Sequence, residues 1–158
     1  MSIDNFKSMM DGFDPAALLP EIDPILEKFA LAARVIILIG PAVLLVMGLV
    51  YLFASPKEAN HYVGYRCYYG MGSVEAWQFT QRLAGIVCSA LGLVLLIVMA
   101  LLGGSFAGLQ TMKLLWRTLY CVAAEAVLAA IACIGINLTA AIRFDSKGNE
   151  RGKKAVRR

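Results

Sequence analysis

The stretch Val63–Trp77, VGYRCYYGMGSVEAW, holds side chains that could recognise a ligand. It contains three glycines, three tyrosines, one arginine and one tryptophan. Glycines allow backbone turns that other residues disfavour. The Arg66 guanidinium, held by the surrounding aromatic rings, could point at Glu75, at a lipid phosphate or at a partner protein. This composition favours a structured, re-entrant loop, and an ordinary aromatic belt without a ligand is the alternative.

A second set of polar residues interrupts otherwise apolar segments and consists of Arg34, Arg117, Glu125 and Asn137. Glu125 falls near the middle of its segment, where an ionised carboxylate would cost a few kcal/mol in a membrane. Its carboxyl group must be protonated, paired with Arg34 or Arg117, or exposed to a watery cavity. Two interpretations stay open: a site for a proton, cation or ligand, and a buried polar contact that holds the helices together. Asn137 lies on another face and is not an obvious partner.

Catalysis and metal binding are not expected. The single histidine, His61, has no nucleophile or base near it in the sequence. The cysteines form no CxxC pair and have no paired histidine, so a zinc site or a structural disulfide is not expected. We interpret these cysteines as small apolar side chains that pack well, and we expect no cofactor. They are Cys67, Cys88, Cys121 and Cys133.

The polar residues must be positioned by membrane helices. The chain has 158 residues, of which 59% are hydrophobic and 16% charged, against roughly a quarter charged in soluble domains. Three apolar segments, Ala30–Ala54, Leu83–Leu102 and Leu114–Ile142, are long enough to span a bilayer, which needs roughly 20 apolar residues in a helix. The sequence predicts an all-α integral membrane protein. It has three transmembrane helices and a structured cytoplasmic loop between the first and second.

The distribution of charge predicts the orientation and three regions. Residues 1–28 form an acidic segment, broken by prolines, that we expect outside and partly helical or disordered. Residues 29–142 form the membrane domain, and residues 143–158 a basic tail. The tail holds seven lysines and arginines and the first loop three, whereas the opposite side holds three or four. The positive-inside rule therefore places the loop and the tail in the cytoplasm. We expect the tail to meet anionic lipid rather than nucleic acid.

Three local patterns predict how the helices behave. Gly40-Pro41 should kink the first helix near Ile37, because proline removes a backbone donor and crowds the preceding turn. Gly85, Ser89 and Gly92 form a small-residue ridge on the second helix, and we expect it to pack against the alanine-rich third helix. Ser73 followed by Glu75 is typical of a helix start. Trp77 would then lie at the cytoplasmic interface, with its ring in lipid.

The spacing of these loop residues resembles the signature of the SdpI immunity-protein family. That signature is N-x-x-[IV]-G-[IYF]-R-[TS]-P in a cytoplasmic loop, followed by S-x-E-x-W and a basic residue that opens the next helix. The resemblance covers about residues 35–142. Cys67-Tyr68 stands where the family has Thr-Pro, so a softer turn replaces a rigid one. The resemblance implies that ligand or partner binding involves Asn60, Gly64, Tyr65, Arg66, Ser73, Glu75, Trp77 and Arg82.

The resemblance also implies a function and a location. Members of this family protect a bacterial cell from a secreted peptide toxin, and they can sequester a transcriptional repressor at the plasma membrane. We expect a non-enzymatic protein of this type, with membrane lipid, a hydrophobic peptide toxin or a cytoplasmic repressor as partners. The alternative is a small transporter or lipid-handling protein that uses Arg66 and Glu125. Three helices cannot enclose a pathway, so that alternative requires a homo-oligomer.

Overall fold

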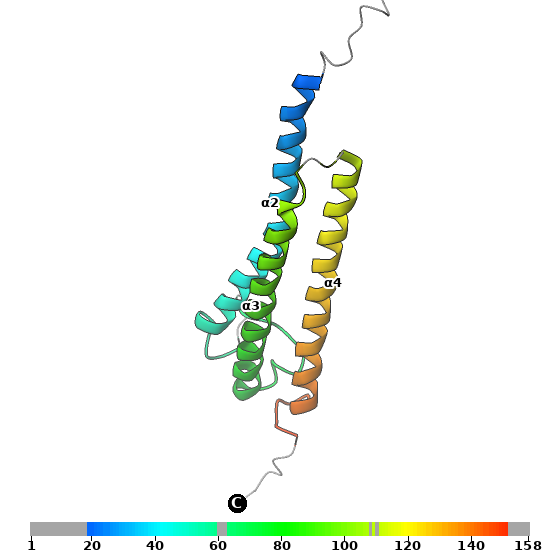
Figure 1. Cartoon of the computed structure of the whole chain (residues 1–158). Helices are drawn as coiled ribbons and strands as arrows, with labels where there is room; N and C mark the ends of the chain where they lie inside the picture. The colour runs from blue at the N-terminus through cyan, green and yellow to red at the C-terminus, as the bar shows by residue number, and fades with distance from the viewer. Residues whose placement is uncertain (1–18, 60–62, 108, 110, 152–158) are drawn as a thin grey trace, which may run out of the picture.

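Three long helices form the structure, a computed structural model that describes residues 19–59, 63–107, 109 and 111–151. They are α2 (Leu19–Phe53), α3 (Val74–Gly104) and α4 (Thr111–Arg143), shown in Figure 1. The segments Glu27–Phe53, Val74–Gly104 and Met112–Arg143 are long and apolar enough to cross a membrane. The described residues contain no β-strand, only an isolated bridge between Phe144 and Glu150. The predicted all-helical membrane fold is confirmed.

The helices run longer than the apolar segments. The first begins at Leu19 and passes through Pro20 and Pro24 without a break. Pro20 lies in the first turn, where the N–H that it lacks would have no partner. Pro24 lies in the second turn, where proline costs one helical hydrogen bond, and the helix continues through it. The prediction that prolines break this segment is therefore wrong for residues 19–28. The predictions made for residues 1–18 lie outside the described residues.

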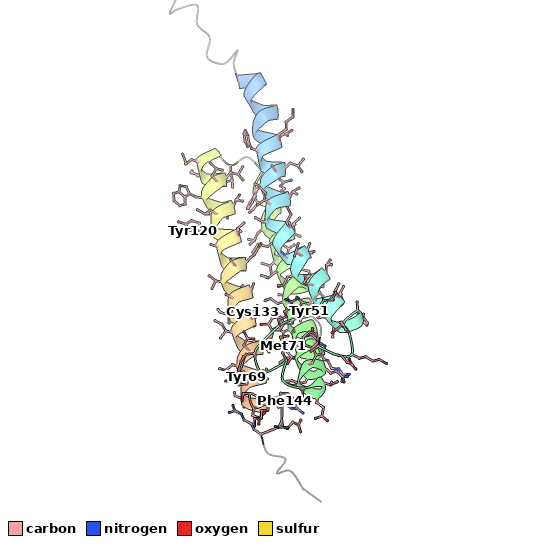
Figure 2. The ribbon with its side chains drawn as sticks, turned by 180° about the vertical axis from the view of Figure 1, so that it is seen from behind. Tyr51, Tyr69, Met71, Tyr120, Cys133 and Phe144 are labelled. Atoms are coloured by element: carbon pink, nitrogen blue, oxygen red, sulfur yellow. The ribbon has the colours of Figure 1, made fainter. Side chains whose placement is uncertain are left out.

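The two polar ends of the bundle differ. The connection from α2 to α3 and the chain that follows α4 lie at the same end (Figure 1), and we call this the motif end. The start of α2 lies at the opposite end, where its first turns extend beyond the α3–α4 connection. Met71, Tyr69 and Phe144 all lie at the motif end, whereas Tyr120 lies far up α4 (Figure 2).

The closest helix contact joins α2 and α3, and here one prediction is wrong. The ridge of Gly85, Ser89 and Gly92 packs on α2 rather than on the alanine-rich α4. A Cβ atom at Gly92 would lie 2.5 Å from the backbone nitrogen of Leu45. On the other side of the contact, a Cβ at Gly48 would overlap the backbone of Ser89. The ridge fits α2 because Gly48 has no side chain at the contact, which lets the two backbones approach closely.

The third helix is covered less. Half of its alanines are exposed, and so are large apolar side chains such as Ile131 (59%) and Leu138 (60%). Its buried residues are Leu114 near its start, Glu125 in its middle, and Ile136 and Ala140 near its end. In a membrane this exposed face would contact lipid or another protein.

The kink prediction concerns Gly40-Pro41 in the middle of α2. The helix is continuous through this dipeptide, and its ribbon changes direction between the blue and the cyan part (Figure 1). Pro41 is fully buried. Gly40 faces α4, because the Glu125 carboxylate lies directly against it. The change of direction in α2 therefore lies where α2 contacts α4.

The contact of Gly48 with α3 gives a test of the fold. Gly48→Ala should lower the free energy of unfolding by roughly 1–3 kcal/mol, because the new methyl group would overlap the α3 backbone and force the helices apart. Gly135→Ala on α4 is the matched control, since a Cβ there meets nothing within 4 Å. Unfolding in mixed micelles, followed by circular dichroism, measures both. Equal stability of the two variants would contradict the close α2–α3 approach.

Candidate binding site at the motif end

The loop after α2 is fastened to α3 by a glycine and a glutamine. Gly64 has a φ of 128°, a conformation that other residues adopt only with strain. A Cβ here would also lie 2.7 Å from the Trp77 ring. Gln81 is 3% exposed. Its amide accepts a hydrogen bond from the Tyr65 N–H and donates one to the Tyr65 carbonyl, both at 2.7 Å. One side chain thus satisfies both backbone groups of Tyr65, as a neighbouring strand would.

Trp77 supports the loop from inside. Its side chain is fully buried, and its indole N–H donates to the Pro56 carbonyl over 2.9 Å. Trp77 lies at the motif end as predicted, but the prediction that its ring lies in lipid is wrong. The loop folds over the ring, because Gly64 leaves room for it.

Tyr65 carries the loop across to α4. Its single O–H proton is shared between two acceptors, the Cys133 carbonyl at 3.2 Å and the Asn137 side-chain oxygen at 3.3 Å. Its ring meets the Tyr51 ring edge-on, with the centroids 6.2 Å apart. Burial raises the pKa of the Tyr65 phenol, and the nearby Cys133 raises it further. The hydroxyl therefore stays protonated at neutral pH and remains a donor. Asn137, which was not an obvious partner for Glu125, is instead one of the anchors of the loop.

The turn after α4 closes over the other half of the motif. Ser73 caps α3 by accepting from the Ala76 N–H at 3.1 Å, and its hydroxyl donates to the Gly148 carbonyl at 2.7 Å. Gly72 and Gly148 touch through their backbones, since a Cβ on either one would overlap the other residue. The predicted serine cap is therefore correct. It also holds the C-terminal turn, which we define as residues 144–151.

Asp145 shapes the C-terminal turn. Its carboxylate accepts from the backbone N–H groups of Lys147 and Asn149 at 2.9 and 2.8 Å. The hydrogen bonds from Asn149 lower the pKa of the Asp145 carboxyl group, and those from Lys147 act in the same direction. Gly148 follows with a φ of 76°. An aspartate that binds its own following backbone, together with a glycine, is a common way to build a tight turn.

Arginine and aromatic side chains meet beside this turn. The Arg143 guanidinium lies 4.3 Å from the centre of the Phe79 ring. It also pairs with the Glu150 carboxylate at 2.9 Å. Together with Glu75, Arg82 and other side chains, these groups line an open cleft between α3 and the end of α4.

The predicted loop residues divide into two groups. Gly64, Tyr65, Ser73 and Trp77 make the contacts described above. The exposed charged residues Arg66, Glu75 and Arg82 have no hydrogen-bond or ion-pair partner among the described residues. The predicted aromatic cage around Arg66 is wrong, because the arginines that face aromatic rings in the described structure are Arg143 and Arg151. Asn60 lies outside the described residues.

The polar residues within the spans do not form the ion pair considered above. Glu125 is 8% exposed, and its Oε1 atom has no hydrogen-bond partner among the described residues. Arg34 is half-buried with an unpaired Nε atom, and Arg117 is exposed. The Glu125 carboxyl group instead fills the space over Gly40, where a Cβ would lie 2.6 Å from its Oε2 atom. An uncompensated carboxylate is costly at this depth, so we expect Glu125 to be a neutral acid.

Comparison with known proteins places the chain in a family. The model of the SdpI/YfhL protein family matches residues 57–137, about half of the chain. The protein belongs to this family. The match begins in the loop after α2 and ends within α4, so it includes the motif residues, all of α3 and most of α4. No curated protein and no solved structure matches the chain. The protein is therefore a multi-pass membrane protein of the SdpI type.

Sequence analysis missed several residues that build this end of the bundle. Gln81 lies within the motif, between Trp77 and Arg82, and its position one helical turn after Trp77 was the signal that could have found it. Phe79 and Arg143 come together only because the start of α3 lies beside the end of α4. The C-terminal turn was treated as tail, although D-S-K-G-N at 145–149 is a turn sequence. The turn lies beyond the matched residues.

Gln81→Leu tests the fastening of the loop. The change should lower the free energy of unfolding by roughly 1–3 kcal/mol, because the backbone N–H and carbonyl of Tyr65 would lose their partner. Gln78→Leu, three residues earlier, loses only one exposed hydrogen bond to the Lys57 carbonyl. It is the control and should change stability by less than about 0.5 kcal/mol. Hydrogen exchange at Tyr65 should rise only in Gln81→Leu. Unchanged exchange there would show that the loop does not need this glutamine.

Glu125→Gln tests the neutral acid. The amide has nearly the same shape and no charge, so the free energy of unfolding should stay within about 1 kcal/mol of the wild type. Glu125→Lys should destabilise strongly, because it places an unpaired cation against Gly40. Unfolding in mixed micelles measures both variants. A large loss of stability in Glu125→Gln would instead indicate an ionised Glu125 paired with an arginine.

Proposed function

We propose that this protein is a non-enzymatic bacterial plasma-membrane protein that gives immunity to a membrane-active peptide toxin, or binds a cytoplasmic regulator, through its motif end. The observation that carries the proposal is the division within the motif. Gly64, Tyr65, Ser73 and Trp77 form a scaffold, and this scaffold leaves Arg66 exposed and without a partner among the described residues.

The hydrogen bonds that hold Tyr65 and the buried Trp77 in place support recognition. A loop that is already ordered loses little conformational entropy when it binds, so its contacts contribute more fully to affinity. Exposed apolar side chains accompany Arg66, among them Tyr68, which is 74% exposed, and Met71. A cation beside aromatic and apolar groups suits an amphipathic peptide with an acidic group. Family membership adds support, because immunity is the role that the resemblance implies.

Orientation is part of the proposal. The motif end carries the loop and the turn after α4, and their lysines and arginines favour the cytoplasmic side. The start of α2 would then face outward. A hydrophobic peptide could reach the motif end through the membrane, and a soluble regulator could reach it from the cytoplasm.

A small transporter or lipid-handling protein is the second candidate. The observation in its favour is the buried, unpaired Oε1 atom of Glu125. This candidate requires self-association, for which the exposed apolar face of α4 offers a surface. Arg66 lies at the motif end and Glu125 in the middle of α4, so one site within a single chain would not use both residues.

Arg66→Ala tests the proposed function. A sensitive bacterium that expresses the wild type should survive membrane-active peptide toxins, and the variant should lose that protection, because the exposed guanidinium makes the recognition contact. Survival over a toxin dilution series is the measurement. Lys113→Ala, an exposed cation on the first turn of α4 at the opposite end, is the control and should protect like the wild type.

The amount of protein in the membrane is measured for each variant. Full protection by a normally expressed Arg66→Ala variant would contradict a role for the loop in toxin recognition. No protection by the wild type against any peptide would favour the transport or lipid-handling candidate.

A further inference from the structure

The cleft between α3 and the end of α4 is a candidate site separate from Arg66. Its volume is about 330 Å³, and it is lined by Glu75, Gln78, Phe79, Arg82, Arg143, Phe144 and Glu150. Two acids and two arginines therefore face the same open space. The recognition contact of the proposed function is Arg66, which does not line this cleft.

One arginine and one acid of the cleft pair with each other. Arg143 forms hydrogen bonds to Glu150 through Nε at 3.2 Å and through one terminal nitrogen at 2.9 Å. Its guanidinium also stacks on Phe79. The other terminal nitrogen keeps its donors for a ligand. This pair forms one wall of the cleft.

The second acid and the second arginine of the cleft are available to a ligand. Glu75 and Arg82 are exposed, and neither has a hydrogen-bond or ion-pair partner among the described residues. They are seven residues apart on α3, which is two helical turns, or roughly 10 Å along the axis. Glu75 is nearer the end of the helix, and Arg82 lies deeper toward the membrane. The cleft therefore presents an acceptor on its outer side and a cation on its inner side.

The same face of α3 continues as an apolar surface. Ile86 and Leu93 follow Arg82 at helical spacing and are 54% and 51% exposed. They belong to the membrane-crossing part of the helix. From the membrane outward, this face thus offers apolar side chains, then an arginine, then a carboxylate.

We propose that the cleft binds the headgroup of a phospholipid that carries a primary ammonium group, with its acyl chain along Ile86 and Leu93. A phospholipid has the matching order, from acyl chain to phosphate to ammonium. Arg82 and Arg143 would hold the phosphate, which arginine binds well through its forked donors. Glu75 would accept hydrogen bonds from the ammonium group. A quaternary ammonium headgroup has no N–H to donate, so the site discriminates against it.

Lipid retention by the purified full chain tests this assignment. Delipidated protein in detergent is mixed with equal amounts of phosphatidylethanolamine, phosphatidylcholine and phosphatidylglycerol, and bound lipid is counted by native mass spectrometry. The wild type should retain phosphatidylethanolamine roughly tenfold better than the other two, the size expected for one charge-assisted hydrogen bond. Equal retention of all three lipids would overturn the proposal.

Two variants assign the roles. Glu75→Gln should lower the retention of phosphatidylethanolamine to that of phosphatidylcholine, and Arg82→Gln should lower the retention of all three lipids. Lys113→Gln, at the opposite end, should behave as the wild type. Circular dichroism of each variant without lipid confirms that the helices are intact. A folded Glu75→Gln variant that keeps the wild-type preference would overturn the role of the carboxylate and with it the proposal.

A competition experiment distinguishes binding of the lipid from binding of its free headgroup. Soluble glycerophosphoethanolamine carries the same phosphate and ammonium groups without acyl chains. It should fail to displace the lipid at equal concentration, because it cannot contact Ile86 and Leu93. Displacement at equal concentration would assign the cleft to a soluble phosphoamine and overturn the lipid assignment.

Discussion

The motif end depends on one constraint: a loop packed among membrane helices has to pair its backbone polar groups without a helix or a sheet of its own. An unpaired backbone group is costly wherever water is excluded. Gln81 supplies both partners for Tyr65 from the side of α3. The loop is thereby fixed against α3, and Tyr65 can extend across to α4. The contact between Gln81 and Tyr65 therefore helps to position the exposed side chains of the loop.

Glycines allow the close contacts on which the packing of the loop and helices relies. Gly64 lets the loop lie on the Trp77 ring, and Gly72 lets the turn after α4 touch the start of α3. Gly48 does the equivalent between α2 and α3. In a bilayer, lipid tails are as apolar as the helices, so association relies on close packing and hydrogen bonds. The glycines that look like flexible points in the sequence act here as contact points.

The helices could be predicted from the sequence, and most of their partners could not. Length and composition predict three spans, and Ser73 predicts the start of α3. The ridge of Gly85, Ser89 and Gly92 shows that a helix packs there but not which one. That choice depends on the complementary Gly48, which no local pattern pairs with the ridge. Likewise, the C-terminal turn joins the site only because α3 begins where α4 ends.

Within the loop, the structure accounts for the departure from the family signature. Cys67-Tyr68 replaces Thr-Pro, yet the chain still turns here. The Cys67 sulfur accepts a hydrogen bond from the Gly70 N–H at 3.2 Å, and the Cys67 carbonyl accepts one from the Met71 N–H. Hydrogen bonds thus hold a turn that proline would set through its fixed φ. Tyr68 stands where the signature has proline, and its side chain is 74% exposed. The departure from the signature therefore adds an aromatic ring to the surface that the loop offers to a partner.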